Sequence, residues 1–367
     1  MSLIRPLQPA DISQVAALYQ DMFLKRHKTP SPGLMSCLDE FYLSGPSADP
    51  EIPSLVHIDG RGDISGFVGI NVVPMTFGDK KMRAAFCGAL MVRDHEHDPM
   101  AGARLLKAFL SGPQNFSLSE TANKTSLEMS RALRGITFAP YSLEWMKVLR
   151  PAAFACDMAL RKSSLRRWTL PVAQGLDRLQ RWSGIGSIGR DMPGTPAGSL
   201  SVERVDAEKF ANAIEPLISH FSLRLCWTDS QLRHIVAQAY DKPRYGEAIG
   251  ALVTGANGVA IGAFLYHLRP GGVGRVIQIL ALPGREGKII DCMISDADQR
   301  GAAGLRGRTQ PLLCDAMLGK GILFANASST ILFSRDETLI DCFRRGQAFV
   351  NGLAGESWGR HIGGEFR

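Results

Sequence analysis

The stretch MVRDHEHDPMAGARLLKAFL at 91–110 combines residue types that could do chemistry. An apolar, strand-like run ends at Val92, a charged loop follows, and a helix is predicted to begin near Gly102. On a strand, His95 and His97 would share one face and could chelate a metal ion. Alternatively, the loop and the first helical turn could hold a phosphate, because the first N–H groups of a helix lack intrahelical partners.

The two histidines therefore have three interpretations: a metal site, solvated loop side chains, or a role beside a bound phosphate or acceptor. A zinc site needs three or four ligands, and the sequence shows no further ligand cluster. We expect no metal here.

Two parts of the chain repeat one pattern of elements, which must position these residues. The segments 55–68 and 252–265 both read as strand, glycine-containing turn and strand, at an offset of 197. Before them, 4–19 and 202–217 each read as a short strand followed by an amphipathic helix. A third strand, then a loop and a helix, follows each hairpin. This order predicts a duplicated α/β unit with a mixed sheet flanked by helices.

The predicted boundaries are a first domain over 1–165, a basic helix and Gly/Pro linker over 166–198, and a second domain over 199–367. Eight Lys or Arg and two Asp between 150 and 190 carry +6 of the net charge of +7. This segment could be a connecting helix whose Val172, Leu176 and Leu179 pack on a domain. Its part 161–181 could instead contact an anionic membrane surface, or an anionic substrate or RNA.

Composition narrows the class of protein further. The 367 residues are 45% hydrophobic and 21% charged, which is typical of a globular chain of two domains. The seven cysteines are widely spaced without a CxxC pair, and no secretory leader or membrane-spanning run is visible. We expect a cytoplasmic protein. Outside 150–190 the charge is nearly balanced, so we expect no nucleic-acid partner.

The loop and helix at 97–104 resemble the acyl-CoA-binding motif Q/R-x-x-G-x-G/A of the GNAT superfamily of N-acyltransferases. His97 stands in the first position, Met100 replaces the middle glycine, and Gly102 takes the last. The resemblance implies two GNAT-like domains, with the pyrophosphate of acetyl-CoA or another acyl-CoA at this helix. The residues that it implies for the cofactor are Met91, Val92, Arg93, His97, Gly102, Ala103, Arg104 and Asn123.

The segment at 123–130 resembles the downstream pattern Asn-x-x-Ala-x-x-Leu-Tyr of the same superfamily. Asn123 matches, whereas Ser130 occupies the position of the tyrosine that commonly protonates the leaving thiolate. A thiolate with a pKa near about 8–9 can leave without an acid, so the exchange is compatible with catalysis.

Acyl transfer to an amine also requires a group that takes a proton from the nitrogen. The candidates are Asp94, Glu96 and Glu120, each of which could equally be a solvated surface carboxylate. Glu120 is our first choice because it ends the strand where an acceptor should enter.

Together these features predict an acyltransferase, with acetyl passing from acetyl-CoA to an amine of a small molecule or a cell-envelope precursor, in a bacterial protein. One alternative is a Fem-like or long-acyl transferase on an envelope precursor. The other is a non-catalytic, degenerate GNAT binding protein. The oligomeric state is left open.

Overall fold

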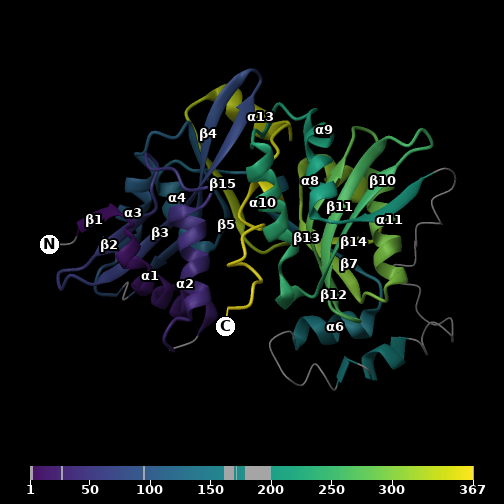
Figure 1. Ribbon diagram of the computed structural model, residues 1–367, viewed down its shortest axis with the longest axis horizontal. Coiled ribbons are helices and arrows are strands. Elements are labelled where there is room, and N and C mark those ends of the chain that lie inside the picture. Colours follow the sequence, from purple (N-terminus) through teal and green to yellow (C-terminus); the bar gives the residue numbers. More distant parts are fainter. Residues whose placement is uncertain are drawn as a thin grey trace.

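The computed structural model describes residues 3–25, 28–93, 96–160, 169–170, 172–177 and 200–366. Two mixed β-sheets lie next to each other, each flanked by helices, and the C-terminal segment runs between them (Figure 1). This arrangement confirms the predicted fold class.

The first sheet is built mainly from the N-terminal half. Its strand order is β1-β2-β3-β4-β5-β15-β6, with β9 pairing to β3. The bounds are Leu3–Pro6, Leu55–Ile58, Ile64–Phe77, Lys80–Val92 and Phe116–Ala122 for β1–β5, Ile136–Thr137 for β6, Leu223–Leu225 for β9 and Ser329–Phe333 for β15. Its helices are α1 (Ile12–Tyr19), α2 (Pro32–Asp39), α3 (Ala101–Leu110) and α4 (Lys124–Ala132).

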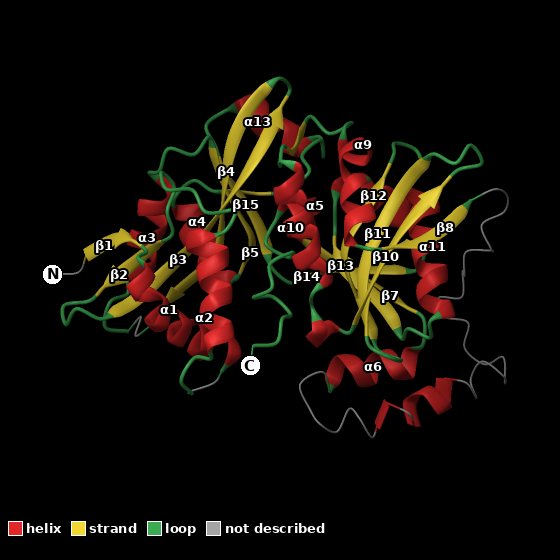
Figure 2. Ribbon diagram, in the orientation of Figure 1, coloured by secondary structure: helices red, strands yellow, loops and turns green. Residues whose placement is uncertain are grey.

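The second sheet repeats that order as β8-β10-β11-β12-β13-β7-β14. The strands are β7 (Leu143–Val148), β8 (Ser201–Val205), β10 (Glu247–Thr254), β11 (Ala260–Leu268), β12 (Val273–Ala281), β13 (Gly304–Arg308) and β14 (Ile322–Asn326). The helices that accompany it are α6 (Pro151–Ala159), α8 (Ala207–Asn212), α9 (Ile214–Ile218), α10 (Asp229–Tyr240), α11 (Glu286–Gln299) and α12 (Pro311–Met317). Figure 2 shows the two strand layers with their helices.

The two halves exchange interior strands, and the short β9 of the C-terminal half also pairs with β3 of the first sheet. Strand β7 leaves the N-terminal half and inserts between β13 and β14, whereas β15 inserts between β5 and β6 of the first sheet. The predicted linker 166–198 lies mostly outside the described residues, and each sheet takes strands from both sides of it. Neither sheet is therefore complete without the other half of the chain.

Amphipathic helices cover the sheets as the sequence pattern predicts. In α3, Leu105, Leu106 and Phe109 are buried and pack against strand residues such as Val68 and Ile70. These apolar positions recur at helical spacing, so one face of α3 packs on the sheet and the other faces outward. The helix is thereby held with its N-terminus at the end of β4.

The described part of the connecting segment packs differently from the expectation. Val172 and Leu176 are 66% and 53% exposed, so the expectation that they pack on a domain is wrong. Leu170 and Ala173 are buried instead. The carboxylate of Asp177 accepts the N–H groups of Ala152 and Ala153 at 2.9 and 2.8 Å, capping α6 and fixing this helix face inward. Leu179 lies outside the described residues.

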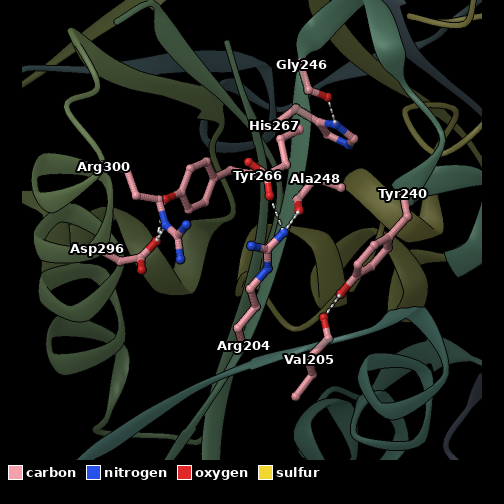
Figure 3. A network of polar contacts seen from close by, with 10 residues as sticks. Arg204, Val205, Tyr240, Gly246, Ala248, Tyr266, His267, Asp296 and Arg300 are labelled. Atoms are coloured by element: carbon pink, nitrogen blue, oxygen red, sulfur yellow. Dashed lines mark hydrogen bonds and ion pairs between the residues drawn. The ribbon is translucent and has the colours of Figure 1, made fainter. Parts of the chain in front are cut away.

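Polar contacts tie the strands of the second sheet to its helices (Figure 3). The hydroxyl of Tyr266 on β11 donates to Asp296 of α11, which also pairs with Arg300 at 2.9 Å. The hydroxyl of Tyr240, at the end of α10, donates to the carbonyl of Val205 on β8 at 3.2 Å. These contacts lie away from the candidate active site.

All seven cysteines are free thiols. Within the described ranges, no helix combines the length and the apolar character needed to cross a bilayer.

Candidate active site

A gap opens between β4 and β5, the two parallel strands at the centre of the first sheet. They pair only where Ala84–Phe86 meets Phe116–Leu118. Beyond this point β4 continues to Val92 without β5, so on that side its backbone N–H and C=O groups have no strand partner. The β3–β4 pairing shifts its register at a β-bulge, in which Gly88 is the extra residue of β4. This bulge lies at the mouth of the gap.

A cavity of about 90 Å³ lies at this gap. Its walls are residues 87–90 of β4 and Ser119 and 121–123 at the end of β5, and Leu106 of α3 and Ser130 of α4 also line it. The cavity thus lies between two strand edges whose backbone groups have no strand partner on this side. Unpaired N–H groups of this kind can stabilise an oxyanion.

Glu120 lies on β5 between two residues that line the cavity, and it is only 1% exposed. Its Oε2 accepts the backbone N–H of Glu356 at 2.8 Å, and its Oε1 has no partner among the described residues. Burial raises the pKa of the Glu120 carboxyl, and the Arg308 guanidinium opposes that shift. The predicted base is thus a buried carboxyl rather than a solvated one.

A second buried carboxyl, Glu356 of the C-terminal segment, accompanies Glu120. It is 1% exposed, and burial together with the Glu120 charge raises its pKa well above the ordinary value. A Cβ atom placed on Gly88 would lie 3.4 Å from Glu356 Oε2 and 3.3 Å from the Tyr42 hydroxyl. Because position 88 has no side chain, both polar groups reach the wall of the gap.

Arg308 of β13 connects the carboxyl pair to the second sheet. Its Nη2 donates to the carbonyl of Glu120 at 2.6 Å and to the hydroxyl of Thr330 at 3.0 Å. Burial lowers the pKa of this guanidinium, while both carboxylates raise it. The cation therefore offsets part of the cost of burying negative charge at Glu120 and Glu356.

The C-terminal segment that carries Glu356 is anchored at several points. The carbonyl of Gly355 accepts Nδ2 of Asn71 at 3.4 Å. Further along, Lys242 Nζ donates to the carbonyls of Gly359 and Ile362, each at 2.8 Å. Burial lowers the pKa of Lys242 to about 7. These contacts hold the segment against the same face of the first sheet as Glu120.

The N-terminus of α3 is where the resemblance expects the pyrophosphate. Met100 precedes the helix, and no side chain caps it. The carboxylate of Asp98 faces this turn: it pairs with Arg104 and lies 3.5 Å from Nε2 of His57. Arg104 donates to the same His57 nitrogen at 3.0 Å. The Arg104 side chain therefore contacts the loop that precedes α3. A bound phosphate would compete with Asp98 for this arginine.

The other predicted cofactor residues occupy different positions around this turn. Arg93 pairs with Asp21 at 3.2 Å. Gly102 is buried, and a Cβ there would meet Val92 and Met129 at 3.6 and 3.4 Å, which are ordinary van der Waals distances. Met91, Ala103 and His97 are respectively buried, half-buried and exposed.

Asn123 and Ser130 both line the cavity, as the resemblance expects for residues near the donor. Asn123 Oδ1 accepts the N–H of Ser126 at 2.9 Å and so caps α4. This cap fixes the start of α4. Ser130, further along the same helix, is buried and lines the cavity at the gap. Ser130 thus lines the cavity and Glu120 lies on the strand beside it, whereas His97 and Glu96 are exposed in the loop before α3.

The equivalent gap of the second sheet is filled by the chain itself. Strands β12 and β13 pair in parallel only from Val273–Arg275 to Gly304–Arg306. Beyond that point, the N–H of Leu353 donates to Gln278 Oε1 at 3.0 Å, and a Cβ on Gly352 would overlap Gln278. The C-terminal segment therefore occupies this gap, whereas the gap of the first sheet has the cavity described above.

No group of three His, Cys, Asp or Glu that could hold a metal is found in the part of the chain that the structure describes. His95 and Asp94 lie outside that part, so the metal alternative for the two histidines is not tested by it.

The chain has the fold of the GCN5-related N-acetyltransferases, as three solved structures show. The N-acetyltransferase of this class from Kribbella flavida superposes with a TM-score of 0.53 at 13% identity, covering 90% of this chain and 70% of its own. The corresponding protein from Anabaena variabilis gives a TM-score of 0.56 at 10% identity, covering 90% of this chain and 72% of its own.

A conserved protein of unknown function from Enterococcus faecalis, described as a probable N-acyltransferase, gives a TM-score of 0.58 at 10% identity, with coverage of 90% and 72%. No protein-family model and no curated protein matches the sequence.

Sequence reasoning missed Glu356, Arg308 and Tyr42. The only local signal for Glu356 is a single acidic residue in the apolar, glycine-rich run NGLAGESWG. Such a carboxyl is costly to bury, so its position in an apolar run is the feature that could have indicated a role.

Proposed function

We propose that this protein is an acyl-CoA-dependent N-acyltransferase that transfers a short acyl group, acetyl in the simplest case, to an amine. The observation that carries the proposal is the β4–β5 gap with two buried carboxyls at it and an uncapped helix N-terminus near its end. The filled gap of the second sheet supports the first sheet as the donor site.

In this proposal the acyl donor enters the gap beside β4 with its pyrophosphate at the N-terminus of α3. The free N–H groups of β4 stabilise the oxyanion that forms when the amine nitrogen bonds to the thioester carbon. The carbon–sulfur bond then breaks, and CoA leaves as a thiolate. Ser130 lines the cavity and can donate a hydrogen bond to that sulfur.

The proton released by the nitrogen passes to Glu120. A carboxyl with a raised pKa binds a proton more readily near neutral pH than an ordinary one, which suits a general base. The backbone N–H of Glu356 donates to Glu120 Oε2 and holds this carboxyl in place. The cavity volume of about 90 Å³ favours a short acyl group over the long-acyl alternative.

The test combines binding and turnover. Isothermal titration with acetyl-CoA measures donor binding, and release of the CoA thiol in the presence of a panel of amines measures transfer. We expect Glu120→Gln to retain acetyl-CoA affinity and to lower kcat by roughly 100-fold or more. Glu128→Gln, which changes an exposed carboxylate on α4, is the matched control and should leave both unchanged.

Absence of acetyl-CoA binding at millimolar concentration would overturn the proposal and favour the non-catalytic alternative. Full turnover in Glu120→Gln would instead remove this residue from its assigned role while leaving the acyltransferase activity intact.

A further inference from the structure

A second cavity, of about 160 Å³, lies at the second sheet on the side of α6 and the C-terminal segment. Its most unusual feature is four arginines in its wall, contributed by separate parts of the chain. They are Arg244 after α10, Arg269 after β11, Arg275 of β12 and Arg306 of β13.

The arginines outnumber the carboxylates near them. Asp157 lies 4.0 Å from Arg269, and Glu144 lies 3.4 Å from Arg306. Asp157 is also engaged by the N–H of Val273 at 3.0 Å and is only 1% exposed. In the part of the chain that the structure describes, four arginines thus line the cavity with Asp157 as its one lining carboxylate, and Glu144 lies nearby.

Two of the arginines have no carboxylate partner among the described residues, and one of these is held in a fixed orientation. The Arg275 guanidinium lies 4.7 Å above the ring of Tyr245, a cation–π contact that restrains its direction. Arg275 and Arg306 are direct partners in the parallel β12–β13 pairing, so their side chains leave the same face of the sheet. A Cβ on Gly363 would overlap the Tyr245 ring, so the C-terminal segment packs against it.

The positive charge of these arginines shifts the pKa values of neighbouring groups. The pKa of Lys242 is lowered to about 7 by burial and then by the Arg275 charge. The Arg275 charge also lowers the pKa values of Arg308 and His267, after burial as the main cause. A bound dianion would relieve this mutual repulsion.

We propose that this four-arginine pocket binds the phosphate group of a small phosphorylated molecule. Planar guanidinium groups that approach from several directions match the oxygens of a phosphate, and bidentate pairing makes such contacts strong. The cavity of about 160 Å³ has room for a phosphate and a few further atoms. This site is separate from the β4–β5 gap.

The experiment titrates the full-length protein by calorimetry with inorganic phosphate, glycerol 3-phosphate and succinate at constant ionic strength and without any acyl donor. We expect both phosphates to bind and succinate to bind at least tenfold more weakly. Tighter binding of glycerol 3-phosphate identifies an organic phosphate as the source, and equal binding identifies the free ion; both support the proposal.

Arg275→Met keeps the alkyl stem and should weaken phosphate binding by about tenfold or more. Arg233→Met changes an exposed arginine on α10 and is the control, which should bind as the wild type does. If Arg275→Met fails to fold, Arg244→Met tests the same pocket from an exposed position. Equal affinity for succinate, no phosphate binding, or unchanged binding in both pocket variants would overturn the proposal. Because no acyl donor is present, none of these outcomes bears on acyl transfer.

Discussion

At the scale of single residues, the most informative feature is that two carboxyls are buried side by side. Glu120 and Glu356 share one contact, each keeps one oxygen without a partner among the described residues, and the burial of both raises their pKa values. Burying an incompletely paired carboxyl costs free energy of folding. Such a cost is common where a group is kept for its chemistry.

This cost predicts how stability depends on pH. A carboxyl whose pKa is higher in the folded than in the unfolded chain binds more protons when folded, so stability falls as pH rises above its ordinary value of 4.5. Glu356→Gln cannot ionise and should escape this loss. We expect its melting temperature to exceed that of the wild type by roughly 2–4 °C at pH 8, and the difference to vanish near pH 4.

Thermal unfolding followed by circular dichroism between pH 4 and 8 measures the effect. Glu128→Gln serves again as the control and should show no pH-dependent difference. A Glu356→Gln protein that melts below the wild type at pH 8 would mean that the ionised carboxylate stabilises the fold.

Sequence reasoning reached part of this residue-level picture. Glu120 and Ser130 were chosen by their positions after a predicted strand and on a predicted helix. Ser130 lines the cavity, whereas Glu120 is buried on β5 between two lining residues, and the roles of both stay predictions. The partners of Glu120 could not be predicted, because Glu356 is more than two hundred residues away along the chain and belongs to no periodic element. Local patterns carry no information on such a contact.

At the scale of elements, the N-terminus of α3 has the geometry of an anion-binding site, and the Asp98 carboxylate already lies there. Asp98 pairs with Arg104 at this turn, and its pKa is lowered chiefly by that contact. The helix dipole favours the Asp98 carboxylate for the same reason that it would favour a phosphate. A phosphate that binds at this turn would therefore compete with the Asp98 carboxylate.

Removing that competitor should strengthen donor binding. In Asp98→Asn, a pyrophosphate would no longer compete with a carboxylate for Arg104 and the first turn of α3, and we expect CoA to bind about three- to tenfold more tightly. Calorimetric titration with CoA measures this effect. Pantetheine, which lacks the pyrophosphate, is the control ligand and should bind both proteins equally. Weaker CoA binding in Asp98→Asn would indicate that Asp98 positions Arg104 for the ligand.

The elements themselves were largely predictable. The hairpins of β2–β3 and β10–β11, the following strands and helix α3 all occur where alternation and helical spacing indicated them. The face on which the segment 172–177 packs could not be predicted. Val172 and Leu176 are exposed, although they recur at the same helical spacing as residues of a buried face. There, the cap that Asp177 provides to α6 decided the orientation.

At the scale of the whole molecule, the exchange of β7 and β15 makes the two halves mutually dependent. Each exchanged strand is an interior strand, bonded on both sides by strands of the other half. No sequence pattern reveals this arrangement, because a strand carries the same alternation whichever sheet it joins.

The exchange predicts the behaviour of separated halves. Residues 1–199 and 200–367, produced alone, should each lack a central strand and fail to give a cooperative thermal transition. Produced together, they should associate and elute as one species in size-exclusion chromatography. Independent cooperative folding of either half would show that the missing strand is dispensable.

The same exchange has a consequence for biosynthesis. Translation proceeds from the N-terminus, so the slot between β5 and β6 stays vacant until the ribosome has released Ser329–Phe333, near the end of the polypeptide. Throughout that interval the nascent chain displays the bare edge of β5, a surface that invites wrong pairing or chaperone capture. The first sheet therefore stays unfinished while the residues between β5 and β15 are synthesised.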